Sequence, residues 1–137
     1  MPRRRAAEAR PSRNMAKATK LKDRAHARIY HAWFKLPAWR SLSGNAVKLL
    51  CAMLAEFRPL DGNNGRLAWS DKRAGDAIGM SETSGRRALA ELEAKGWIAV
   101  QRFGKMRRDM PTFYALACYP NNETGEPATM AFEHWQP

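Results

Sequence analysis

Residues 79–96, GMSETSGRRALAELEAKG, decide the fold that this sequence predicts. Ser81 is a typical helix N-cap and Gly96 a typical residue just past a helix end, so the stretch predicts a helix from Ser81 to Lys95. The positions expected to face a core follow the spacing i, i+3, i+4, i+7, and they are Gly85, Ala88, Leu89 and Leu92. The opposite face is polar and carries Glu82, Thr83, Arg86 and Arg87.

Three helical segments are expected before this helix. An apolar pattern starts at Asp23 and ends at Pro37, because the residue before a proline is displaced from the helical region. Its apolar side comprises Ala27, Ile29, Tyr30, Trp33 and Phe34. Ser43 caps a second helix, whose wide apolar surface is typical of a central core helix. After a loop at residues 58–65 and an extended piece at 66–69, Ser70 caps a third helix of about Asp71 to Ile78 that ends at Gly79.

Two strands are expected after it, at residues 97–103 and 112–118. The hairpin loop between them, 104–111, carries three cations: Lys105, Arg107 and Arg108. Beyond Tyr119 no periodic core pattern is visible, which leaves Phe132 and Trp135 without an evident packing site. The other four tryptophans, Trp33, Trp39, Trp69 and Trp97, are expected to fill a core between the helices and the sheet.

The length of 137 residues suits a single domain with a modest core, and the net charge of +11 favours anionic partners. Residues 1–28 hold ten Lys and Arg against two acids, so most of the excess lies near the N-terminus. We expect a disordered basic arm at residues 1–22, a domain at 23–118 and a tail at 119–137. The arm suits a DNA-binding role, a non-specific tail or a targeting segment; its first arginines are Arg3, Arg4, Arg5, Arg10 and Arg13.

Several classes of protein find no support in the sequence. No apolar run follows the basic N-terminus as in a secretory signal, and none approaches the roughly 20 residues of a membrane span. Cys51 and Cys118 sit in apolar runs, which predicts buried free thiols in a reducing, cytoplasmic setting. The histidines have no ligand-like spacing with them, and no phosphate loop or paired-carboxylate signature is present. We therefore expect no metal, no cofactor and no enzymatic activity.

The order helix, helix, short strand, helix, tight turn, helix and hairpin resembles the winged helix-turn-helix DNA-binding domains, especially those of phage, plasmid and prophage-type proteins of proteobacteria. Three stretches carry the resemblance: LPAWRSLSGNAVKLLCAML (36–54), NNGRLAWSDKRAGDAIGMSETSGRRALAELEAKGWIAVQRFG (63–104) and TFYALA (112–117). The resemblance implies a mainly α-helical fold with a small antiparallel β-sheet.

The resemblance also implies roles for individual residues. The helix 71–78 would support a recognition helix at 81–95 that lies in a major groove, with Met80 of the turn packed into the core. The side chains nearest to DNA would be Glu82, Thr83, Ser84 and Arg86. Arg86 and Arg87 would bind either a guanine edge or a phosphate. Ser70 and Lys72 would bind a phosphate at a helix start, and the loop cations Lys105, Arg107 and Arg108 would form the wing. Gly85 departs from the family, where a larger residue is usual, so either the two helices approach closely or this helix is less rigid.

The expected function is therefore that of a DNA-binding protein, either a transcription regulator or a small replication-initiation factor. Its partner would be double-stranded DNA, and a homodimer on two half-sites is compatible with this role. The alternative is a winged-helix module that binds a protein, such as a phage-derived, anti-CRISPR-like inhibitor of a nucleic-acid-binding host protein. A basic RNA-binding protein is a third hypothesis, which competition between duplex DNA and double-stranded RNA separates from the first.

Overall fold

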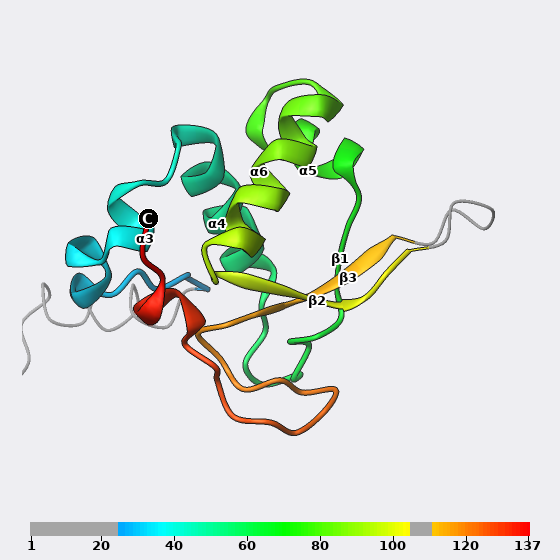
Figure 1. The fold of residues 1–137 in the computed structure, drawn as a ribbon. Coiled ribbons are helices and arrows are strands. Elements are labelled where there is room, and N and C mark those ends of the chain that lie inside the picture. The colour runs from blue at the N-terminus through cyan, green and yellow to red at the C-terminus, as the bar shows by residue number, and fades with distance from the viewer. Residues whose placement is uncertain (1–24, 105–110) are drawn as a thin grey trace, which may run out of the picture.

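The computed structural model describes residues 25–104 and 111–137, and it contains four α-helices and a three-stranded antiparallel sheet (Figure 1). The elements in chain order are η1 (His31–Lys35), α3 (Pro37–Arg40), α4 (Gly44–Glu56), β1 (Leu67–Trp69), α5 (Asp71–Ile78), α6 (Glu82–Ala94), β2 (Ile98–Arg102), β3 (Thr112–Leu116) and η3 (Ala131–His134). The expected combination of helices with a small antiparallel sheet is confirmed. The arm residues 1–22, with Arg3, Arg4, Arg5, Arg10 and Arg13, and the loop cations Lys105, Arg107 and Arg108 lie outside the described residues.

Serine caps fix where the three longer helices begin. The hydroxyl oxygens of Ser43, Ser70 and Ser81 accept hydrogen bonds from the backbone N–H groups of Ala46, Arg73 and Ser84, respectively. Each bond satisfies one N–H group that a helix start leaves without a partner. The predicted starts of α4, α5 and α6 are confirmed.

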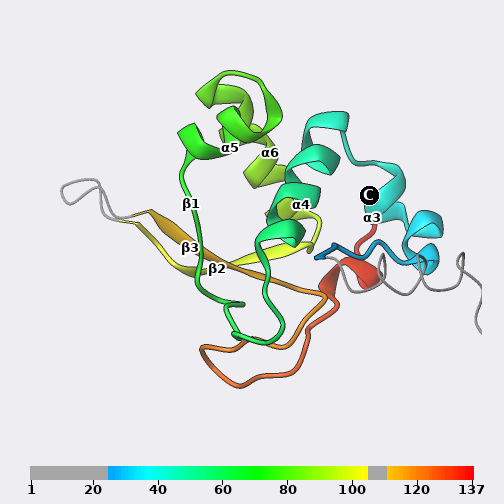
Figure 2. The same ribbon diagram turned by 180° about the vertical axis from the view of Figure 1, so that it is seen from behind.

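The sheet has the strand order β1-β3-β2, with both pairs antiparallel. The buried residues of its helix-side face are Leu67, Trp69, Ile98, Tyr114 and Leu116. The β2–β3 hairpin runs out past the helices on the side away from α3, as Figures 1 and 2 show from opposite directions. The molecule therefore has helices over one part of the sheet and an uncovered strand pair beyond them.

The C-terminal segment corrects the sequence interpretation, because Phe132 of η3 is part of the core. Its ring is fully buried and stacks on Trp97 with centroids 4.1 Å apart and planes 6° from parallel, while Trp33 meets both rings edge-on. Gly96 makes room for this contact, since a Cβ there would collide with the backbone of Ala131 and Phe132. Trp135 packs partly buried against the core. The sequence could not show this packing, because a lone aromatic has no periodicity.

The N-terminal helix expected between Asp23 and Pro37 is also corrected. Residues 25–30 have no regular secondary structure, the short 3-10 helix η1 follows them, and Pro37 is the first residue of α3. Of its apolar residues only Trp33 is buried, whereas Tyr30 and Phe34 are exposed. Only Trp33 and Phe34 of this set lie in η1, and successive residues of a 3-10 helix point about 120° apart, so one of the two is buried and the other is not.

Met80 was expected in the core, but 52% of its surface is exposed. Gly79 ends α5 in the left-handed conformation (φ 71°), and the Met80 N–H donates back to the Gly75 carbonyl at 2.9 Å. The backbone of the turn itself lies against α5, because a Cβ on Gly75 would collide with the carbonyl of Ser81. No space is left between turn and helix for the Met80 side chain, so it leaves the core.

The tryptophans behave largely as expected. Trp33, Trp69 and Trp97 are buried, and Trp39 packs half-buried against them. Cys51 and Cys118 are free thiols, but they are half-buried instead of fully buried. Burial raises the pKa of both thiols, that of Cys118 to about 12, so both are protonated at neutral pH.

None of the helices in the part of the chain that the structure describes has the length and apolar character to cross a membrane. Within residues 25–104 and 111–137, no group of three or more His, Cys, Asp and Glu side chains gathers in a way that could hold a metal ion.

Candidate nucleic-acid interface

The start of α6 is held in place by direct backbone contact with α5. A Cβ on Gly85 would lie closer than 3.0 Å to the Gly75 nitrogen and to the Asp71 carbonyl oxygen, a separation that real Cβ atoms essentially never show. Of the two explanations for a glycine at this position, the close approach of two helices is therefore the one that holds. The contact fixes the first two turns of α6 relative to α5.

The face of α6 opposite this contact is not covered by any of the residues that the structure describes. Its exposed residues are Glu82, Thr83, Arg86, Arg87, Ala90, Glu93 and Ala94. At about 100° per residue, Thr83, Ala90 and Ala94 lie along the middle of the exposed stripe, and Arg86 and Arg87 lie on either side of it. The middle of the stripe thus carries short side chains, so another molecule can approach the helix backbone closely there.

The two arginines are available to a partner. The Arg86 guanidinium lies 4.0 Å from the Asp71 carboxylate, with the two side chains 59% and 42% exposed, which is a weak, solvent-screened pair. Arg87 is exposed and makes no ion pair or side-chain hydrogen bond with any of the described residues. Both guanidinium groups keep their donors for an external acceptor.

Two acids share this surface with the arginines. Glu82 lies in the first turn of α6, where a carboxylate interacts favourably with the helix dipole, and Glu93 lies three turns further on. The α6 face is therefore close to neutral overall. The net positive charge of the chain therefore lies outside the α6 face, and most of it is at residues 1–28.

Ser84 is the expected contact residue that the structure does not bring to this face. It is half-buried, its N–H donates to the Ser81 hydroxyl at 3.1 Å, and its own hydroxyl accepts from Ser81 at 3.2 Å. Ser84 therefore belongs to the N-cap of α6. Thr83 is the side chain of the first turn that offers an exposed hydroxyl.

Of the two residues at the start of α5 that were expected to contact a phosphate, Ser70 is used within the fold and Lys72 is exposed. The Ser70 hydroxyl accepts from the Arg73 N–H at 3.0 Å, so its oxygen caps α5, while Lys72 is exposed. Arg73 is engaged within the fold, because it donates to the Ala68 carbonyl and the Glu56 carboxylate and lies 3.8 Å over the Trp69 ring. Lys72 is thus the cation that this helix start presents to solvent.

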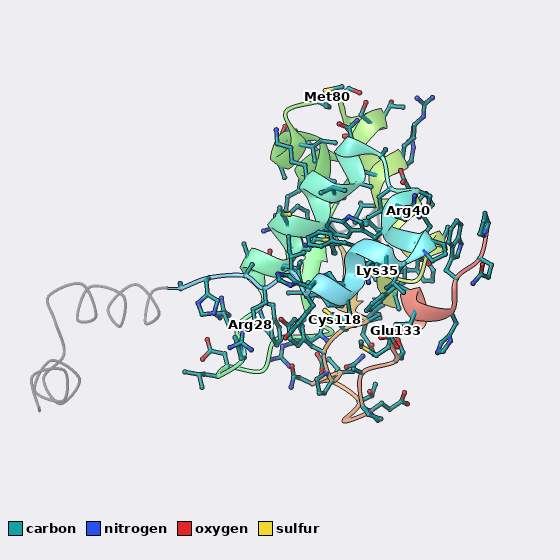
Figure 3. The ribbon with its side chains drawn as sticks, turned by 90° about the vertical axis from the view of Figure 1, so that its left-hand side faces the viewer. Arg28, Lys35, Arg40, Met80, Cys118 and Glu133 are labelled. Carbon is teal, nitrogen blue, oxygen red and sulfur yellow. The ribbon has the colours of Figure 1, made fainter. Side chains whose placement is uncertain are left out.

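Two large apolar residues outside α6 are exposed, against what burial of apolar side chains in the core leads one to expect. Met80 lies at the α5–α6 turn, and Figure 3 shows it at the top of the molecule, away from Arg28 and Lys35. Phe103 follows β2 on the hairpin and is 76% exposed. Alternation along the strand could not place Phe103 correctly, because a β-bulge between Val100 and Arg102 shifts the register.

No known family model, curated protein or solved structure compared with the chain matches it. What this surface binds is therefore inferred from its own geometry and charge.

Proposed function

We propose that the protein binds double-stranded DNA as a winged helix-turn-helix domain, with α5 as the supporting helix and α6 as the recognition helix in the major groove. The observation that carries this proposal is the outward stripe of α6, whose short central side chains are flanked by two arginines without strong partners. A helix with such a surface fits the roughly 12 Å width of the major groove of B-DNA.

The roles of the side chains follow from their places on the stripe. Arg86 and Arg87 can each donate two hydrogen bonds to a guanine edge or hold a phosphate, one on each side of the helix. Thr83 faces the groove floor in the first turn, where recognition helices contact base edges. Glu82 is tolerated close to DNA if its carboxylate accepts from a cytosine amine.

The charge distribution supports the same proposal. The basic residues that precede residue 28 and follow residue 104 are numerous enough to neutralise several phosphates, whereas α6 itself is nearly neutral. Such a division assigns attraction to cations outside α6 and selectivity to the helix. Both a transcription regulator and a small replication-initiation factor would use an interface of this kind, and a homodimer would set two α6 helices one helical turn of DNA apart.

The test is fluorescence anisotropy of the full chain with a labelled random-sequence duplex, at about 50 and 200 mM salt. We expect binding at least in the micromolar range at the lower salt, weakened at least tenfold, roughly, at the higher salt if three or more phosphates are contacted. Unlabelled duplex DNA should compete better than double-stranded RNA, whose major groove is too deep and narrow for a helix. Equal competition would favour an RNA-binding protein, and absence of duplex binding would favour a protein partner.

A further inference from the structure

The end of the sheet next to the hairpin loop carries the aromatic residues Trp69 and Phe113, on opposite faces. On the helix-side face Trp69 of β1 pairs with Thr112 of β3, and Trp69 is only 3% exposed, with the core on one side and the guanidinium of Arg73 over its ring. On the other face Arg102 pairs with Phe113, with its guanidinium 4.8 Å from the ring centroid. Both of these rings therefore have a cover within the protein.

The β-bulge determines on which face of the sheet Phe103 lies. Val100 pairs with Tyr114, but Arg102 pairs with Phe113, so Gln101 is the additional residue. Side chains alternate along a strand, so Phe103 falls on the face opposite to Arg102, which is the helix-side face of Thr112 and Trp69. Without the bulge Arg102 would lie on that face and Phe103 on the other.

Phe103 nevertheless has no cover from the helices. The β2–β3 hairpin extends beyond α5 and α6 (Figure 1), and 76% of the Phe103 side chain remains exposed. The Gly104 N–H donates to the Thr112 hydroxyl at 3.0 Å, which holds the strand pair together at this point. A large apolar side chain thus follows β2 on the projecting part of the hairpin, on the same side of the sheet as the helices.

The surroundings of Phe103 in the sequence are cationic. Arg102 precedes it, and Lys105, Arg107 and Arg108 follow with Asp109 as the only acid before residue 112. An apolar residue with cations next to it in the sequence is complementary to a polyanion that also offers apolar surface between its charges. DNA has that combination, because its base pairs and deoxyriboses lie between two rows of phosphates.

We propose that Phe103 is an apolar wedge that enters the minor groove beside the groove taken by α6 and partly unstacks one base step. The proposal rests on the duplex binding proposed above. Insertion between base pairs costs stacking energy, which contacts of the buried ring and of the bent DNA offset. Pyrimidine–purine steps such as TA unstack most readily, so we expect the wedge to favour them.

The experiment uses the full chain and a duplex of about 30 base pairs that contains TA steps, with 2-aminopurine in place of the adenines at those steps and a donor–acceptor dye pair at its ends. The wild-type protein should raise 2-aminopurine fluorescence and shorten the end-to-end distance. Phe103→Ala should abolish both signals and weaken binding about tenfold, with an unchanged dependence of affinity on salt, because no phosphate contact is lost. Phe103→Leu should retain most of each signal, since leucine can also act as a wedge.

Leu60→Ala is the matched control, because Leu60 is a fully exposed apolar residue in the loop before β1 and its loss should change nothing. Each variant is compared by its thermal melting curve, so that misfolding is recognised. Wild-type binding without a bend or a fluorescence change would overturn the wedge and leave the duplex-binding proposal intact. Absence of duplex binding by the wild type would overturn both proposals. Retention of both signals by Phe103→Ala would overturn the wedge alone.

Discussion

At the scale of single residues, the most informative position is Gly85. Alanine is favoured over glycine in a helix interior by about 1 kcal/mol, so helix propensity alone would select against this residue. Here the Gly75 backbone occupies the place of a side chain, and contact between the two helices determines the residue type. The glycine pair Gly75 and Gly85 is thus the means by which α6 is held at a defined distance from α5.

We expect Gly85→Ala to lower the free energy of unfolding by about 2 kcal/mol, because the added methyl group forces the two helices apart. Urea denaturation monitored by circular dichroism measures this change. Gly44→Ala is the control, since Gly44 is also helical and has nothing within 4 Å of an added Cβ. That variant should be neutral or stabilised by up to about 1 kcal/mol. A neutral Gly85→Ala would show that the contact is not as close as described.

At the scale of elements, a polar clamp joins the start of α4 to the end of α6. The Glu91 carboxylate accepts from the Ser43 hydroxyl at 2.7 Å, from the Ser43 N–H at 2.8 Å and from the Lys95 ammonium at 3.1 Å. Lys95 also donates to the Ser41 carbonyl at 2.7 Å. Burial by itself raises the pKa of Glu91, but the bonds from Ser43 and Lys95 outweigh it and leave the pKa lowered.

This clamp predicts a particular dependence of stability on pH. Because the pKa of Glu91 is lower in the folded state than in the unfolded state, its contribution is complete above the ordinary value of 4.5 and is lost as the pH falls through the folded-state pKa. Glu91→Gln should therefore cost about 1–2 kcal/mol at about pH 7, and the difference from wild type should shrink on acidification. Urea denaturation at several pH values measures it, with exposed Glu93→Gln as control. A difference that stays constant with pH would contradict the clamp.

The elements also show what the sequence could predict and what it could not. Helix starts at Ser43, Ser70 and Ser81 depend on bonds within three residues, so their local signals sufficed. The burial of Phe132 depends on Trp97, and the exposure of Met80 depends on a glycine five residues earlier that closes the turn. Neither the burial of Phe132 nor the exposure of Met80 follows from a periodic pattern in the sequence.

Long-range polar contacts were equally invisible in the sequence. Asn64 reads as an ordinary turn residue, yet it is fully buried and its amide donates to the carbonyls of Leu116, Tyr119 and Pro120. Its side-chain oxygen accepts from the Leu116 N–H at 2.6 Å. In the proposed site, the exposed face of α6 was predictable from the helical period. The sequence did not show that Ser84 belongs to the N-cap of α6, or that a β-bulge moves Phe103 to the helix-side face.

At the scale of the whole molecule, the net charge and the face of α6 have different parts in the proposed DNA binding. The net charge of +11 lies mostly outside α6, while the exposed face of α6 has as many acids as arginines. If the protein binds DNA as proposed, removal of any exposed cation would weaken the attraction, and all exposed cations would share this effect. Removal of Arg86 and Arg87 should do more, because these two would contact the DNA directly.

The measurement that tests the central claim most directly is a comparison of two charge-matched double variants on the same labelled duplex. One is Arg86→Ala with Arg87→Ala, and the other is Lys35→Ala with Arg40→Ala, whose exposed side chains lie on η1 and α3 (Figure 3). We expect the α6 variant to bind about tenfold or more weakly than the η1/α3 variant, with a smaller dependence on salt, because two direct contacts are lost. Equal affinities for the two variants would contradict the account, because the duplex would then be held by net charge and not by α6.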